Sequence, residues 1–282
     1  QTIQVGDSSI FTVGQSITTS PGLPDNTWVR EITDATTIRV EGPGLPWGFN
    51  KSYTVSSGYM FVKNADTLTS YKQVSAQGTA DVNNLTLSGA GSAVTLSGGS
   101  TLSIYGNLTR SSGSGAIGSI SGGTGIQAGT LNANLTISTP LASDGLYISS
   151  PILANGTGGL TKTGAGTLII AHSPDAGGYT GKTLIDGGRL SLYNPTNGNA
   201  EVALGVVPGS FEADNITLQN GAILQYSSLA NNNQLTISAN RGTTLGAGTQ
   251  TIERLGQNQL NLNSVISGTG GLFFDALMTN DA

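Results

Sequence analysis

Short segments of alternating apolar and polar residues recur along the chain from about residue 80 onward. Each is followed by a turn that contains Gly, and no window shows a helical period. Apolar side chains at every second position fall on one face of a strand, and the Ser, Thr and Asn residues between them fall on the other. The pattern therefore predicts β-strands with one buried face. The clearest segments are 84–87, 93–96, 101–104, 134–137, 167–170, 182–185, 189–192, 215–218 and 234–237.

One motif, Asn or Gln followed by Leu or Ile and then Thr, returns along these segments. It starts at positions 84, 107, 134, 215 and 234, so its steps are 23, 27, 81 and 19, and 81 is three times 27. A longer repeat is the sequence GTGGL, which occurs at Gly156–Leu160 and again at Gly268–Leu272. Coils of roughly 19 to 27 residues, each with two or three strands, are typical of a parallel β-helix. We therefore expect an all-β protein, a parallel β-helix or β-solenoid.

Glycine supplies the turns between these strands. The chain has 42 Gly without a period of three, which excludes collagen, and its recurring Leu, Ile and Val oppose disorder. Turns that need positive φ take Gly or Asn at the least steric cost. Gly164-Ala-Gly166 and Gly246-Ala-Gly248 faintly resemble phosphate-binding loops, but no helical pattern and no Gly-Lys-Ser/Thr follows. We interpret them as structural turns.

The segment 1–78 differs in composition from the rest of the chain. It contains four Pro that mark loops, and strands are predicted at 36–40 and 53–55. Residues 1–78 are therefore predicted to form an aromatic-rich cap or small β-domain, and residues 79–282 the solenoid, because an open solenoid end needs a cover. The aromatic residues of the first part are Phe11, Trp28, Trp47, Phe49, Tyr53, Tyr59, Phe61 and Tyr71. Of these, Trp28, Trp47 and Phe49 are candidates for glycan or partner binding, although a local core explains them better.

Composition excludes several classes of partner. Charged residues make up 10% of the chain and the net charge is −5, with the 11 Lys and Arg scattered singly, so nucleic-acid binding is not expected. The absence of Cys removes disulfides, thiolate metal sites and thiol nucleophiles. No apolar run is long enough for a membrane span, and no signal peptide opens the sequence. A surface of Ser, Thr, Asn and Gly suits an exported protein, whose mature form we expect to begin at Gln1.

Candidate catalytic groups are few. His172, the only histidine, lies beside Ser173 and Asp175, but neighbours in one loop cannot converge as a triad around an oxyanion hole. The acidic residues nearest to a group are Asp144, Asp175, Asp186 and Glu201, which leaves a paired-carboxylate glycosidase as the alternative. No Asp recurs at the spacing of calcium-binding repeats, and Asp186-Gly-Gly188 is more simply a turn. We predict no catalytic, cofactor-binding or metal site, and no enzyme.

Six Asn-x-Ser/Thr sequences formally permit glycosylation, but most coincide with the strand motif, so ladder packing explains them better. These sequences begin at Asn50, Asn84, Asn107, Asn134, Asn155 and Asn215.

Two adjacent segments resemble a known family. Residues 158–170 (GGLTKTGAGTLII) and 178–192 (GYTGKTLIDGGRLSL) are similar to the autotransporter-associated β-strand repeat. The resemblance implies a right-handed β-helix, bacterial export to the cell surface or medium, a repetitive shaft and often adhesion. It implies no catalytic residue.

We therefore expect an extracellular structural or adhesive shaft or fibre subunit. The apolar segment Leu272–Met278 and the strand-like segment Thr2–Val5 are candidates for completing a neighbour's sheet, which would give an end-to-end polymer of the chain with itself. Other expected partners are surface glycans and proteins. The alternative is a polysaccharide-active enzyme or glycan-binding module on the same fold.

Overall fold

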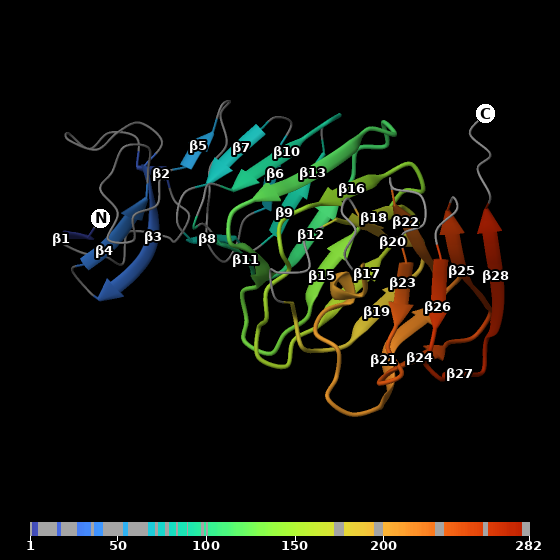
Figure 1. Ribbon diagram of the computed structural model, residues 1–282. Coiled ribbons are helices and arrows are strands. Elements are labelled where there is room, and N and C mark those ends of the chain that lie inside the picture. Colours follow the sequence, from blue (N-terminus) through green and yellow to red (C-terminus); the bar gives the residue numbers. More distant parts are fainter. Residues whose placement is uncertain are drawn as a thin grey trace.

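The protein is described by a computed structural model, shown in Figure 1. The described residues are 2–4, 16–17, 27–34, 37–41, 53–55, 67–70, 73–76, 79–82, 84–88, 90–96, 99, 101–171, 178–194, 200–228, 234–255 and 259–277. Within them the regular structure is β-strand, apart from the 3-10 helix η3 (Ala200–Leu204). No helix in this part of the chain has both the length and the apolar character to cross a membrane.

Two long, mostly parallel sheets form the body of the molecule, and their strands stack in chain order from blue to red in Figure 1. The ten-stranded sheet contains β5 (Tyr53–Val55), β7 (Gln73–Ala76), β10 (Ala93–Leu96), β13 (Ile117–Gly122), β16 (Gly145–Ile148), β18 (Thr167–Ile170), β20 (Arg189–Asn194), β22 (Ile223–Ser228), β25 (Thr249–Leu255) and β28 (Gly271–Leu277). The nine-stranded sheet contains β6 (Thr67–Ser70), β9 (Asn84–Leu87), β12 (Asn107–Arg110), β15 (Leu135–Ser138), β17 (Leu160–Thr163), β19 (Thr183–Asp186), β21 (Glu212–Gln219), β24 (Arg241–Leu245) and β27 (Ile266–Gly268). The chain alternates between the two sheets, which is the topology of a β-solenoid.

A third side completes some of the coils. It is formed by β8 (Thr79–Val82), β11 (Thr101–Ile104) and β14 (Gly125–Ala128) in one sheet, and by β23 (Gln234–Ile237) and β26 (Gln259–Leu262) in another. The pairings on this side are parallel, and in the described part of the two long sheets β5 alone runs antiparallel to its neighbour, β7. The predicted all-β parallel solenoid with two or three strands per coil is therefore confirmed.

The N-terminal strands form a separate antiparallel sheet in the order β1 (Thr2–Gln4), β4 (Thr37–Glu41), β3 (Thr27–Asp34) and β2 (Ser16–Ile17). Trp28 belongs to β3, whereas Trp47 and Phe49 lie outside the described residues. The parallel ladders already include β6 and β7, on the N-terminal side of the boundary predicted at residues 78 and 79.

The alternating pattern builds the core as columns of stacked side chains. In the nine-stranded sheet one inward column runs through Leu85, Leu108, Ile137, Lys162, Ile185, Leu218 and Leu245. These side chains are buried, while the Thr and Ser residues between them face outward. Each fully buried aliphatic side chain contributes about 1.5–3 kcal/mol relative to an exposed one. Burial along these columns therefore stabilises the solenoid even though each strand is short.

Coil length varies more than the sequence motif predicted. Val74 of β7 pairs with Val94 of β10 in the next coil, which is a short repeat. Leu192 of β20, by contrast, pairs with Tyr226 of β22, and η3 and the segment that follows it lie between the two strands. This coil is longer than the range expected from the motif, so the expected range was wrong for this coil.

The pairing of two coils also differs from the motif. Leu108 pairs with Ile137, not with Leu135, which occupies the same place in the motif. The shift is by two positions, which keeps both side chains on the inward face of the sheet.

Glycines with positive φ mark the corner between the two long sheets. Gly164 (φ 83°) connects β17 to β18, and Gly248 (φ 89°) connects β24 to β25, so both Gly-Ala-Gly sequences occupy the same corner as structural turns. The repeat of GTGGL at Gly156–Leu160 and Gly268–Leu272 has no structural counterpart. Leu160 begins β17 in the nine-stranded sheet, whereas Leu272 belongs to β28 in the ten-stranded sheet.

Asparagine side chains tie neighbouring coils together. The Asn84 carboxamide oxygen accepts a hydrogen bond from the N–H of Asn107 at 2.8 Å, and the Asn134 oxygen accepts one from the N–H of Gly159 at 2.9 Å. Asn215 is buried, so it is closed to a glycan in the folded chain. Asn50 lies outside the described residues. For Asn84, Asn134 and Asn215 the ladder interpretation of the Asn-x-Ser/Thr sequences agrees with their surroundings.

Candidate functional site

The predicted chemistry-bearing residues fall into two groups. His172, Ser173 and Asp175 lie outside the described residues. Asp144, Asp186 and Glu201 are described, and each makes its polar contacts with a different part of the fold. Within the described ranges, no cluster of three or more His, Asp or Glu side chains has the arrangement to hold a metal ion.

Asp144 fastens a corner turn. Its carboxylate accepts hydrogen bonds from the N–H groups of Ser112 at 2.9 Å, Gly113 at 3.0 Å and Leu141 at 3.0 Å. Burial acts to raise the pKa of the Asp144 carboxyl, but these three N–H groups and the charge of Arg110 outweigh it, so the pKa lies below its ordinary value. The carboxylate thus stays ionised and holds the loop between β15 and β16 against the loop between β12 and β13.

Glu201 and Asp186 also connect separate segments of the fold through their carboxylates. The Asp186 carboxylate accepts a hydrogen bond from the side chain of Asn220 in the next coil. Glu201, on η3, forms an ion pair with Arg241 at 3.2 Å, and its carboxylate accepts a hydrogen bond from the N–H of Ser238 at 2.6 Å. Neither contact resembles the facing pair of free carboxylates that a glycosidase uses.

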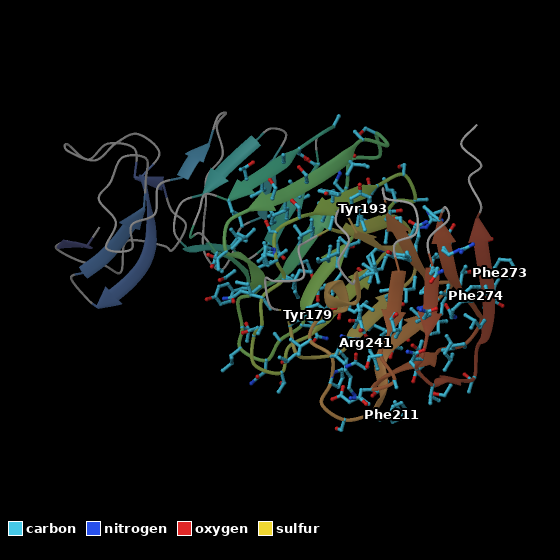
Figure 2. The ribbon with its side chains drawn as sticks, in the orientation of Figure 1. Tyr179, Tyr193, Phe211, Arg241, Phe273 and Phe274 are labelled. Atoms are coloured by element: carbon cyan, nitrogen blue, oxygen red, sulfur yellow. The ribbon has the colours of Figure 1, made fainter. Side chains whose placement is uncertain are left out.

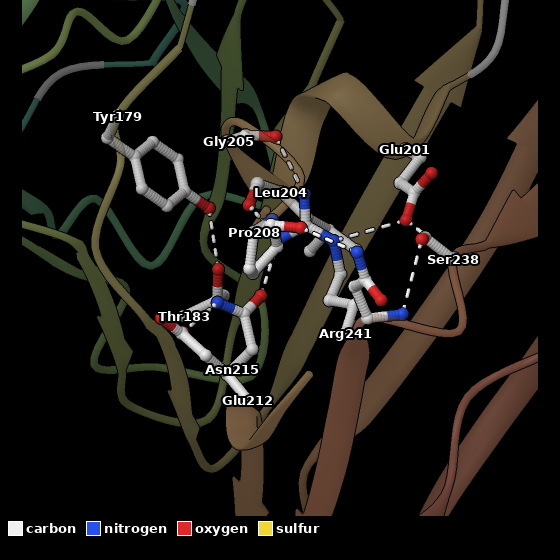
Figure 3. Close-up of polar contacts among 11 residues, drawn as sticks. Tyr179, Thr183, Glu201, Leu204, Gly205, Pro208, Glu212, Asn215, Ser238 and Arg241 are labelled. Atoms are coloured by element: carbon white, nitrogen blue, oxygen red, sulfur yellow. Dashed lines mark hydrogen bonds and ion pairs between the residues drawn. The ribbon is translucent and has the colours of Figure 1, made fainter. Parts of the chain in front are cut away.

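Arg241 is the centre of a buried polar cluster, shown in Figure 3. The residue is 0% exposed, and its guanidinium donates to the Leu204 carbonyl at 2.8 Å, the Gly205 carbonyl at 2.8 Å and the Asn215 side chain at 2.6 Å, besides its contact with Glu201. The cluster therefore joins η3 and the segment after it to β21 and β24. It explains how the longest coil is held on the solenoid.

Lys162 replaces an aliphatic residue in the inward column. Its side chain is buried, and its ammonium donates to the carbonyls of Thr163 at 3.0 Å, Gly164 at 2.8 Å and Gly187 at 3.3 Å. These carbonyls belong to two successive corner turns. Burial lowers the pKa of Lys162 to about 8, against the smaller opposing effect of Asp186.

This lowered pKa predicts a pH dependence of stability. As the pH rises from about 8 toward the ordinary value of 10.5, Lys162 loses its proton in the folded state while the unfolded chain keeps it. The unfolded state then binds more protons, so the free energy of unfolding rises with pH across this window. We expect the Tm of the wild-type chain, measured by circular dichroism, to rise relative to that of Lys162→Met over the same window. A Tm difference that is constant with pH would contradict the assignment.

The outer face of the ten-stranded sheet carries a second polar cluster. Arg189 on β20 and Gln225 on β22 both donate to one carboxylate oxygen of Glu253 on β25, at 3.1 and 2.9 Å. On the same sheet the rings of Tyr147 and Tyr193 meet edge to face, with centroids 6.3 Å apart. Sequence reasoning missed this cluster because its members are distant in the sequence, and only the register of the coils brings them together.

The last described coil differs from those before it because its inward side chains stay exposed. In register, Phe274 follows the buried Ile252 and Leu272 follows the buried Gln250, yet Phe274 is 49% and Leu272 38% exposed. On the outer face Phe273 is 55% exposed. Figure 2 labels both phenylalanines on β28, at the end of the stack. The apolar residues Leu260, Leu262 and Ile266 of β26 and β27 are only partly buried against the core.

Three strand edges meet at this end. In the described chain β28, β27 and β26 are each the outermost strand of their sheets, so each has a neighbour on one side only. An uncovered edge presents backbone N–H and C=O groups that can pair with another strand. We call the face formed by β26, β27 and β28 the open end. Residues 272–277 of the segment singled out in the sequence lie in β28, where Leu272, Phe273 and Phe274 are exposed, while Met278 lies outside the described residues.

Comparison with known proteins gives no relative that would assign a chemistry to these sites. No model of a protein family matches the chain, and neither a curated protein nor a solved structure matches it.

Proposed function

We propose that the chain is a structural or adhesive shaft outside a bacterial cell, and that it acts by taking up a further β-strand at its open end. The observation that carries the proposal is that, in the described chain, Leu272, Phe273 and Phe274 of β28 are exposed and β28 has a neighbour on one side only. Large exposed apolar patches on proteins mark interaction surfaces.

The interior supports a mechanical role. The buried charged groups Asp144, Lys162 and Arg241 bind backbone groups of neighbouring coils, so their polar capacity serves cohesion between coils. Parallel ladders continue along the stack in two sheets. Such contacts make a rod whose coils separate only when many hydrogen bonds break together. For these reasons we propose that the chain is not an enzyme.

Location outside the cell is part of the same proposal. It is supported by the low charge content, the absence of Cys and the resemblance of residues 158–192 to the autotransporter-associated repeat. On the ten-stranded sheet, the partly exposed Arg189, Tyr147 and Tyr193 offer a charged hydrogen-bond donor and aromatic edges to a glycan, whereas Gln225 and Glu253, which bind Arg189 or each other, are buried. These three exposed groups are the feature that favours the alternative of a glycan-binding module.

A peptide with the sequence of residues 271–277 tests strand uptake. We expect the fluorescently labelled peptide to bind the wild-type chain, because it matches the apolar row of β28 and can complete its edge. Phe274→Asp places a charge in that row, and we expect it to weaken binding at least tenfold, as measured by fluorescence anisotropy. Asn261→Asp, on β26, is the matched control for an added charge at the same end.

Equal peptide binding by wild type and Phe274→Asp would refute strand uptake at β28. Incubation of the chain with a panel of polysaccharides addresses the alternative. Cleavage that disappears in Asp186→Asn would show that the chain is an enzyme and that the proposed role is wrong.

A further inference from the structure

We propose that Asn220 is a site of spontaneous deamidation, and that its conversion to a carboxylate weakens the contact between two successive coils. The chain contains three Asn-Gly pairs, at Asn155, Asn197 and Asn220. The pair at Asn197 lies outside the described residues. The inference goes beyond the proposed function, because it holds whatever the chain binds.

The reaction uses groups of the chain itself and water. The backbone nitrogen of Gly221 attacks Cγ of Asn220 and closes a cyclic imide. The bond between Cγ and the carboxamide nitrogen breaks, and that nitrogen leaves as ammonia with the proton of the backbone N–H. Water then opens the ring at one of its two carbonyl groups, which leaves either Asp or isoaspartate at position 220. Glycine favours the attack because it has no Cβ that hinders its nitrogen.

The Asn220–Gly221 pair lies in a surface turn between β21 and β22, and both residues are exposed. Their φ angles are 57° and 71°, so both lie in the left-handed region that is unfavourable for Asn. A Cβ atom placed at Gly221 would meet nothing within 4 Å. The backbone at this turn can therefore rotate without displacing another part of the described chain.

The Asn155–Gly156 pair provides an internal comparison, because the preceding coil holds it in place. The Asn155 carboxamide donates a hydrogen bond to the Thr130 carbonyl at 2.5 Å, and the Asn155 carbonyl accepts one from the N–H of Asn132 at 3.2 Å. A Cβ atom at Gly156 would clash with the Asn132 carboxamide oxygen. Ring closure at Asn155 thus requires two coils to separate, so we expect it to be slower than ring closure at Asn220.

Deamidation changes the contact that Asn220 makes with Asp186. The Asn220 carboxamide now donates a hydrogen bond to the Asp186 carboxylate in the preceding coil. An ionised carboxylate at position 220 cannot donate, and it places a second negative charge beside the first. Isoaspartate also adds a methylene group to the backbone of a turn that is closed by a hydrogen bond from the Ala222 N–H to the Gln219 carbonyl at 3.1 Å. Both products therefore weaken this corner of the solenoid.

Tandem mass spectrometry of the full chain after incubation in alkaline buffer tests the site. We expect the mass at Asn220 to rise by the difference between O and NH, and to do so faster than at Asn155. In urea, where the chain is unfolded, the two sites should react at similar rates. Gly221→Ala should slow the reaction at Asn220 several-fold and leave Asn155 unchanged.

The effect on the fold is tested with two variants that need no incubation. We expect Asn220→Asp to lower the Tm at neutral pH, measured by circular dichroism. Combining it with Asp186→Asn should recover most of the loss, because the amide and the carboxylate then exchange places.

Each contrary result has a defined meaning. Reaction at Asn155 as fast as at Asn220 in the folded chain would overturn the assignment of the site, as would an Asn220 that reacts only in urea. A Tm of Asn220→Asp equal to that of wild type would overturn the weakening of the corner. A loss that Asp186→Asn does not reduce would show that repulsion between the two carboxylates is not its cause.

Discussion

Replacing Arg241 with Met is expected to lower the free energy of unfolding by about 3–5 kcal/mol, the loss typical of breaking a buried ion pair on one side. The substitution removes the partner of Glu201 and of three other buried acceptors, namely Asn215 and the carbonyls of Leu204 and Gly205. Unpaired buried groups keep their desolvation cost. Urea unfolding followed by circular dichroism would measure the loss.

The matched control is the ion pair between Lys182 and Asp214. Its atoms approach to 2.7 Å, but the two side chains are 56% and 53% exposed, so Lys182→Met should cost less than about 1 kcal/mol. Equal losses for Arg241→Met and Lys182→Met would show that the Arg241 cluster does not hold the longest coil.

Gly188→Ala is expected to destabilise the chain far more than Gly221→Ala. Both glycines lie in turns between the two long sheets, with φ of 60° and 71°. A Cβ atom at Gly221 meets nothing within 4 Å, so the cost is that of positive φ alone, about 1–2 kcal/mol. At Gly188 a Cβ atom would clash with the carbonyl oxygens of both Gly164 and Gly166 in the preceding coil.

Relief of that clash requires the two coils to move apart. We therefore expect Gly188→Ala to cost several kcal/mol, roughly twice the loss at Gly221 or more, because strained packing adds about 1–3 kcal/mol to the backbone term. Equilibrium unfolding of both variants under the same conditions measures the difference. Losses that agree within error would mean that coil spacing at this corner is looser than the contacts indicate.

The local pattern predicted the strands because a strand with one buried face has an apolar residue at every second position. The segments 84–87, 93–96, 101–104 and 167–170 coincide with β9, β10, β11 and β18. The pattern could not supply the pairing of coils, since a shift by two positions leaves every side chain on its face. The motif steps therefore gave coil lengths but not the pairing of Leu108 with Ile137, and they did not predict the long coil between Leu192 and Tyr226.

The burial of two charged side chains was not predicted from the sequence, for a related reason. Lys162 and Arg241 are residue types that composition alone assigns to the surface, and their partners include carbonyl groups of turns in other coils. No local signal marks a carbonyl as an acceptor for a distant side chain. The apolar strand at the open end was predictable, because the run of Leu272, Phe273 and Phe274 is apolar on both faces. The exposure of these side chains was not predictable, because it depends on the position of the strand in the stack.

The long coil between β20 and β22 shows that this architecture tolerates added length at a corner. Leu192 and Tyr226 remain neighbours in the sheet although η3 intervenes between their strands, so the rise per coil is unaffected. Each doubling of a flexible excursion costs only about 0.6 kcal/mol in closure entropy. Foreign peptides grafted beside η3 should therefore be displayed laterally without altering the axial repeat, which makes this corner a natural insertion point for cargo.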